Sequence, residues 1–202
     1  MYLIKVEVEL NLRKDSGLLT DCQQMHRFIT GFFGTDRQSG QILYRTNLVQ
    51  NKLCIYIYAQ SPAEHIPDNC EVQQRNVTSW LESMEIGQLW SFDLIAAPTK
   101  KVASEGKKNS QRRILRLPRE RQEWLERKAE QNGFAILQAQ ELEQLHICGR
   151  HKADKGGVMY HDAYHYQGIL QITDGEAFRR AMQTGIGSGK AYGFGMMMVK
   201  RL

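Results

Sequence analysis

The sequence has no hydrophobic run long enough to cross a membrane. Its mean hydropathy is −0.50, and no segment approaches the roughly 18–20 consecutive apolar residues of a transmembrane helix. Near the start of the chain, Lys5, Glu7 and Glu9 interrupt the stretch that a signal peptide would keep apolar. The pattern therefore predicts a protein that neither enters a membrane nor is exported.

Cysteine is also scarce. The 202 residues include four cysteines, at positions 22, 54, 70 and 148, and none of them forms a C-x-x-C pair. A chain of this length buries enough apolar surface to fold without disulfide crosslinks. We therefore expect reduced thiols and a cytoplasmic protein.

The net charge of +5 is modest, but the positive charge is concentrated in one segment. Residues 99–128 hold eleven basic side chains against four acidic ones, which leaves the rest of the chain slightly acidic. Concentrated basic charge on a near-neutral body is typical of a site for a polyanion. The alternative is a solvated helix face joined to a loop.

Hydrophobic periodicity predicts two successive β-α-β-β-α-β units. In the first, alternation of apolar residues over 2–10 predicts a strand, and Asp21 offers the N-cap of a helix that runs to about Phe33. Further strands are expected at 41–46, 52–60 and 88–95, with a short helix at 76–84. The second unit is expected to contain helices at 119–131 and 175–183, strands at 134–142, 160–172 and 192–200, and a hairpin tip at 151–157.

This order of elements predicts an α+β protein built from two tandem ferredoxin-like, RRM-like domains. Residues 1–90 would form an N-terminal domain that carries the first helix. Residues 91–202 would form a C-terminal domain that carries the basic segment and a glycine-rich loop.

The glycine-rich loop, residues 185–195, contains five of the 17 glycines. It is not a P-loop, because too few residues separate the framing glycines and Ala191 stands where the Mg²⁺-binding hydroxyl is required. Its backbone at Gly187 and Gly189, beside Lys190, could approach a phosphate closely and bind it through successive N–H groups. The alternative is a tight loop whose glycines only permit positive φ.

Histidines offer two candidate sites. Five potential metal ligands lie close together in sequence: His146, Cys148, His151, His161 and His165. The spacing H-x-C-x2-H matches no common structural zinc site, so we expect no metal there. His26 lies in the first predicted helix, where a histidine is more often a surface or packing residue than a catalytic one.

Several motifs, taken in order along the chain, resemble those of one enzyme family. They are the opening MYLIKV, the helix segment ending in Met25-His26, WSFDLIAAP at 90–98, the basic stretch, and GIGSGKAYGFG at 185–195. Together they resemble the CasE-type CRISPR RNA-processing endoribonucleases of type I-E systems, which belong to the RAMP superfamily.

The resemblance implies metal-independent cleavage, without a cofactor, of CRISPR precursor RNA at the base of the repeat stem-loop. The upstream 2′-OH would attack the scissile phosphate and leave a 2′,3′-cyclic phosphate and a 5′-OH. His26 would act as general acid or base, because an imidazole titrates near neutral pH, and Arg27 would stabilise charge. The product would stay bound, with the other subunits of the Cascade complex as partners.

The residues expected to bind the RNA come from the basic segment, the hairpin tip and the glycine-rich loop. They are Lys100, Lys101, Lys107, Lys108, Arg112, Arg113, Arg116, Lys152, Lys155, Gly187, Gly189 and Lys190.

Four positions depart from the family pattern. Gln23 and Gly31 stand where some relatives carry a tyrosine and a lysine, and Asp93 and Ile95 replace two arginines. Charge in the transition state must then be stabilised from elsewhere, and turnover is expected to be slow. The alternative is a catalytically weak or inactive RNA-binding subunit of the same complex.

Overall fold

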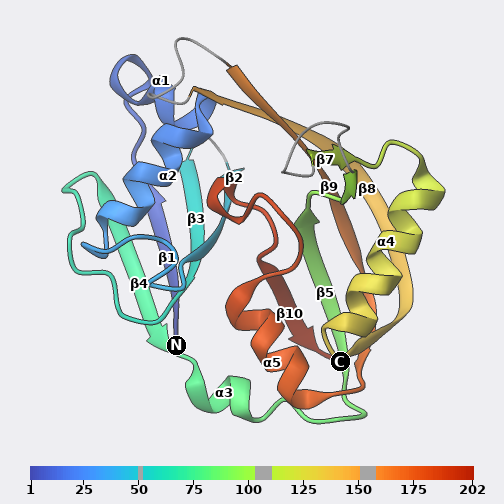
Figure 1. Cartoon of the computed structure of the whole chain (residues 1–202). Helices are drawn as coiled ribbons and strands as arrows, with labels where there is room; N and C mark the ends of the chain where they lie inside the picture. The colour runs from blue at the N-terminus through green and yellow to red at the C-terminus, as the bar shows by residue number, and fades with distance from the viewer. Residues whose placement is uncertain (50–51, 103–110, 151–157) are drawn as a thin grey trace.

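Two four-stranded antiparallel sheets with helices packed on them make up the fold (Figure 1). The structure, a computed structural model, describes residues 1–49, 52–102, 111–150 and 158–202. The first sheet has the strand order β2-β3-β1-β4. Its strands are β1 (Tyr2–Val8), β2 (Leu43–Val49), β3 (Lys52–Ala59) and β4 (Cys70–Asn76).

Helices α1 (Leu12–Thr20) and α2 (Cys22–Gly31) lie beside the first sheet. The inward side chains of β1 pack with Met25 and Ile29 of α2, which confirms the predicted strand and helix. The Asp21 carboxylate caps the start of α2 by accepting a hydrogen bond, at 2.9 Å, from the backbone N–H two residues on. Helix α1 was not predicted.

The first unit ends differently from the prediction. Its fourth strand is β4, which follows β3 without an intervening helix, and α3 (Thr78–Glu82) connects the two sheets instead. Strand β4 lies at the edge of the sheet, and most of its side chains are exposed. An exposed edge strand carries little apolar alternation, so its sequence gives only a weak signal.

The second sheet has the order β10-β5-β9-β8. Its strands are β5 (Leu89–Ala96), β8 (Phe134–Arg150), β9 (Val158–Ile172) and β10 (Met197–Arg201). In both sheets the last strand of the unit pairs with the first, and the first with the third, which is the ferredoxin-like arrangement. The predicted α+β fold of two tandem ferredoxin-like domains is confirmed, whereas the division between residues 90 and 91 stays a prediction.

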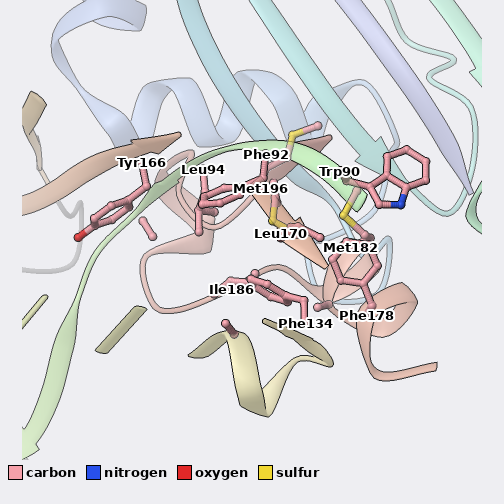
Figure 2. Packing of buried hydrophobic residues seen from close by; sticks show 14 of the residues in the cluster. Trp90, Phe92, Leu94, Phe134, Tyr166, Leu170, Phe178, Met182, Ile186 and Met196 are labelled. Atoms are coloured by element: carbon pink, nitrogen blue, oxygen red, sulfur yellow. The ribbon is translucent and has the colours of Figure 1, made fainter. Parts of the chain in front are cut away.

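Helices α4 (Pro118–Gln131) and α5 (Gly175–Thr184) pack on one face of the second sheet through aromatic and methionine side chains (Figure 2). The rings of Phe134 in β8 and Phe178 in α5 meet edge to face with centroids 5.7 Å apart. This core fixes the end of α5, from which the glycine-rich loop departs. None of the described helices is both long and apolar enough to span a membrane.

A small hairpin precedes α4. It consists of β6 (Thr99–Val102) and β7 (Gln111–Ile114), which pair only with each other. The sequence predicts a loop within residues 98–118. Residues 103–110 lie outside the described residues.

Strand β8 extends well beyond its predicted end at residue 142 and reaches α1 and α2, whereas β9 begins only two residues before its predicted start (Figure 1). Gly149 of β8 lies so close to α2 that a Cβ there would meet the Cys22 sulfur at 2.5 Å. Register shifts near Leu137 and Leu142 interrupt the alternation of side chains, which explains why the sequence predicted a shorter β8.

The last strand is shorter than predicted. Residues 190–192 form a 3-10 turn, η1 (Lys190–Tyr192), and β10 begins only at Met197. Gly193 and Gly195 adopt φ values of +87° and +85°, which an extended strand does not allow.

Candidate nucleic-acid interface

His26 lies on α2, which packs against η1 of the glycine-rich loop. The imidazole is half-buried, and its Nδ1 atom is enclosed without a hydrogen-bond partner among the described residues. Burial, reinforced by the charges of Arg37 and Arg27, lowers the pKa of His26. The free protein therefore holds this imidazole mostly neutral near pH 7.

Arg37 is a half-buried cation in the connection between α2 and β2. Its charge lowers the pKa of His26 on one side and of Lys190 on the other, so it lies within electrostatic reach of both the helix and the loop. Among the described ion pairs none involves Arg37. A half-buried guanidinium with no ion pair among the described residues is suited to bind a phosphate oxygen.

The glycine-rich loop is tightly packed. Gly187 and Gly189 adopt φ values of +87° and +73°. A Cβ at Gly187 would come within 3.1 Å of the Trp124 ring, and one at Gly189 within 2.7 Å of Phe194. The close packing and the left-handed backbone both require glycine, which supports the tight-loop interpretation, while anion binding by the loop N–H groups stays a prediction.

A cavity of about 530 Å³ opens between the glycine-rich loop, the β6–β7 hairpin and α4. Four cations from four elements line it: Lys101 of β6, Arg112 of β7, Lys128 of α4 and Lys190 of η1. Its lining includes the hydroxyls of Thr99, Thr184 and Ser188 and no carboxylate among the described residues. We call this the cationic cavity.

The cations of the cationic cavity repel one another. Burial and the charges of Arg37, Lys128 and Arg112 lower the pKa of the Lys190 ammonium. Burial and the charges of Arg127 and Arg112 do the same for Lys128. Bound anionic groups would relieve this repulsion, so the arrangement is suited to phosphates.

Register along the β6–β7 hairpin separates the predicted cations into two sets. Lys101 lies opposite Arg112, and both line the cationic cavity. Lys100 lies opposite Arg113, one residue along each strand, and so on the other face of the hairpin. The structure therefore brings only one of the two neighbouring arginines to the cavity.

Some of the basic segment is neutralised within the protein. Lys100 pairs with Glu120 at 3.1 Å, and the buried Arg121 pairs with Glu141 at 2.6 Å. The backbone carbonyl of Arg116 accepts a hydrogen bond from Arg121, while the Arg116 residue is exposed outside the cavity. The interpretation as a solvated, ion-paired surface thus holds for part of the segment.

Four predicted RNA-binding residues, Lys107, Lys108, Lys152 and Lys155, lie outside the described residues, as does the predicted hairpin tip. Arg27 is exposed on α2, one residue beyond His26.

Three further side chains meet beside α2 and were not predicted to act together. The amide nitrogen of Gln23 donates a hydrogen bond to the Tyr192 hydroxyl at 3.0 Å. The His161 ring of β9 stacks on the Tyr192 ring, with centroids 4.3 Å apart. His146, another of the candidate zinc ligands, instead contacts Asp162 at 2.5 Å.

Sequence reasoning also missed two cations that the fold brings to the site. Lys128 lies one turn beyond Trp124 on α4, so a helical plot would have placed it beside the loop-facing indole. Arg37 gave no signal, because it lies in a connection without periodicity and reaches His26 only through tertiary structure.

Comparison with known proteins agrees with this arrangement. The profile of a family described as "CRISPR associated protein" matches residues 1–201, and the chain belongs to this family. The family resemblance seen in the motifs is therefore confirmed.

One curated relative, the CRISPR-associated endoribonuclease Cse3 of Thermus thermophilus, is 32% identical over 126 residues. The match covers 58% of this chain and 58% of the relative, so the chain matches somewhat more than half of that protein's length.

Solved structures share the fold over the whole chain. A CRISPR endoribonuclease Cse3 bound to a 19-nucleotide RNA superposes with a TM-score of 0.84, at 24% identity, over 99% of this chain and 100% of that one. A chain of a CRISPR RNA-guided surveillance complex in a pre-nicking state gives 0.77, at 25% identity, with full coverage of both chains.

Proposed function

We propose that this protein is an endoribonuclease that cuts CRISPR precursor RNA at the base of the repeat stem-loop. The observation that carries the proposal is the half-buried His26 on a helix that packs against the loop lining the cationic cavity. One curated relative and one similar solved structure are endoribonucleases of the Cse3 type, and the solved structure is bound to RNA, which supports the same activity.

The reaction is a transesterification within the RNA. The 2′-OH of the upstream nucleotide attacks the scissile phosphorus, and the P–O5′ bond breaks to leave a 2′,3′-cyclic phosphate and a 5′-OH. Because the lowered pKa keeps His26 neutral in the free protein, this imidazole is suited to accept the 2′-OH proton. The nucleophile belongs to the RNA itself and is already close to the phosphorus, so positioning contributes much of the rate.

Charge that develops on the phosphate needs a cation near His26. Arg37 and Lys190 lie within electrostatic reach of one another, and Arg37 also acts on His26. We therefore assign Arg37, together with Arg27, the stabilising role that the family pattern gives to a lysine at position 31. The cationic cavity would hold phosphates of the adjoining stem.

The test is a cleavage assay with a CRISPR repeat RNA in the presence of EDTA. Wild-type protein should give one cut with a cyclic-phosphate end, and His26→Ala should abolish the cut while the dissociation constant for RNA changes less than about threefold. Arg13→Ala, which removes an exposed cation from α1, is the matched control. Tight binding without any cut would instead establish the inactive RNA-binding subunit, and unchanged cutting by His26→Ala would exclude His26 as the catalytic group.

The cleaved RNA is expected to stay bound to the protein within a type I-E Cascade complex. The match to a chain of a surveillance complex at 25% identity supports this partner. We place the protein in the cytoplasm, where reduced thiols persist, and its four cysteines are free.

A further inference from the structure

Tyr192 occupies an unusual position at the junction of three elements. It belongs to η1, its hydroxyl accepts a hydrogen bond from Gln23 of α2, and its ring is stacked on His161 of β9. The two rings are inclined by only 29°, so the phenol is held both at its oxygen and across its face.

The Tyr192 oxygen lies close to the turn of helix that carries His26. Gln23 precedes His26 by three residues, and side chains three apart are neighbours on one side of a helix. The Gln23 nitrogen lies 3.0 Å from the Tyr192 oxygen. The hydroxyl therefore lies on the side of α2 from which the His26 imidazole also projects. His26 and Tyr192 are both half-buried, which leaves each open to a bound substrate.

The hydroxyl has a proton to give. Gln23 is the donor in the bond between the two side chains, so the phenol proton is not used there. Among the described hydrogen bonds, none has the Tyr192 hydroxyl as donor. Burial raises the pKa of Tyr192, so the phenol stays protonated at neutral pH and acts as a hydrogen-bond donor rather than a base.

His161 supports the ring without competing for the proton. Its Nε2 atom is buried and has no hydrogen-bond partner among the described residues. Burial lowers the pKa of His161, so the ring is neutral near pH 7 and packs as a flat platform under Tyr192.

We propose that Tyr192 is a catalytic residue, whose hydroxyl donates a hydrogen bond to a non-bridging oxygen of the scissile phosphate beside His26, and that Gln23 and His161 are its positioning residues. The inference rests on the proposed function. The inference also gives a role to Gln23, which stands where some relatives carry a tyrosine. Its amide orients the phenol of Tyr192, which belongs to another element.

The experiment uses the full chain with saturating protein over a repeat RNA, so that the rate of a single turnover is measured. Affinity is measured separately with the same RNA carrying a 2′-deoxy nucleotide at the attacking position, which cannot be cut. Tyr192→Phe keeps the stacked ring and removes only the hydroxyl. Because loss of one preorganised donor to a developing oxyanion costs on the order of 100-fold, we expect about that loss of rate with affinity unchanged within about twofold.

Two further variants keep the inference falsifiable. Tyr2→Phe, which removes a phenol hydroxyl at the start of β1, should cut at the wild-type rate. Gln23→Met leaves Tyr192 in place but without its donor, and a smaller loss of rate, about tenfold, is expected. The double variant should be no slower than Tyr192→Phe alone, because Gln23 acts only through the hydroxyl.

Each outcome decides the question. Wild-type rates in Tyr192→Phe would overturn the inference and leave the proposed function intact. Equal losses of rate and affinity would make Tyr192 a binding contact and also overturn it, as would additive losses in the double variant. If the wild-type protein cuts no repeat RNA at all, the proposed function fails and this inference fails with it.

Discussion

At the scale of single residues, the imidazole of His26, the proposed catalytic group, has a pKa that is set by its neighbours. Burial and the charges of two arginines lower the pKa of His26, and Arg37 has a larger effect than the adjacent Arg27. An i to i+1 neighbour on a helix points away, which explains why the residue next in sequence has less effect than one eleven positions on.

The pKa of His26 can be measured directly. In the free protein, NMR titration of the His26 ring should give a midpoint below the ordinary value of about 6.5. Arg37→Met removes a positive charge that disfavours the imidazolium, so the midpoint should move to higher pH. Arg13→Met on α1 is the control and should leave it unchanged. A midpoint that is unchanged or lower in Arg37→Met would contradict this assignment.

Gly187 tests the packing of the glycine-rich loop. Gly187→Ala places a Cβ 3.1 Å from the Trp124 ring at a φ of +87°, so the free energy of unfolding should fall by about 1–3 kcal/mol. Gly31→Ala is the matched control, because a Cβ there meets nothing within 4 Å and alanine favours helix by about 0.5–1 kcal/mol. Urea unfolding measures both, and a neutral Gly187→Ala would show that the loop relaxes.

At the scale of elements, the register of the β6–β7 hairpin decides which of its cations line the cationic cavity. Alternation along its strands turns Arg112 toward the cationic cavity and Arg113 away from it. Two arginines that are adjacent in sequence are thus expected to differ in function, which a count of basic residues does not reveal.

Salt-dependent binding should separate the two arginines. Arg112→Ala should lower affinity for repeat RNA and reduce the slope of log affinity against log salt by about one, because one phosphate contact is lost. Arg113→Ala should change the slope by clearly less. Filter binding at several salt concentrations measures both slopes. Equal slopes for the two variants would show that RNA contacts both faces of the hairpin alike and would contradict the prediction.

Element prediction succeeded where one face of an element is buried. The strand at β1 and helices α2, α4 and α5 carry strong apolar periodicity and were found within a few residues. Strand β4 and the far half of β8 were not predicted. In β4 only Cys70 and Val72 pack on the core, and in β8 the register shifts break the alternation before Leu145 and Ile147 resume it.

At the scale of the whole molecule, an ion pair joins the two sheets. Arg45 of β2 contacts Asp93 of β5 at 2.5 Å, and His165 and Gln167 of β9 also bind this carboxylate. The family resemblance places an arginine at position 93. The aspartate found there instead forms an ion pair with Arg45. The pair therefore links the first sheet, on which α2 packs, to the second sheet.

Acid should weaken this junction. Burial raises the pKa of Asp93, but the hydrogen bonds from Arg45 and Gln167 and the charges of Arg45 and His165 together outweigh it, so the net shift of the pKa is downward. A lowered pKa in the folded state gives stability that is present above the unfolded value of about 3.9 and is lost as the pH falls through the folded value.

The prediction is a change in acid unfolding. Arg45→Met should cost about 1–3 kcal/mol at pH 7, because it leaves a half-buried carboxylate without its cation, and should flatten the loss of stability between about pH 5 and 3. Lys52→Met, which removes an exposed cation 3.8 Å from Glu7, is the control. Urea unfolding across this range measures the effect, and an unaltered pH dependence would contradict it.

Sequence patterns were enough to predict the fold class, the family and His26 as a candidate catalytic residue. Local periodicity, helix capping and glycine motifs depend on residues that are close in sequence, so they can be recognised without the tertiary structure. The contacts of Arg37 with the surroundings of His26, of Tyr192 with Gln23, and of Arg112 rather than Arg113 with the cationic cavity come from the tertiary structure alone. These contacts depend on which faces of different elements meet, and a contact between two elements leaves no periodic pattern in the sequence of either one.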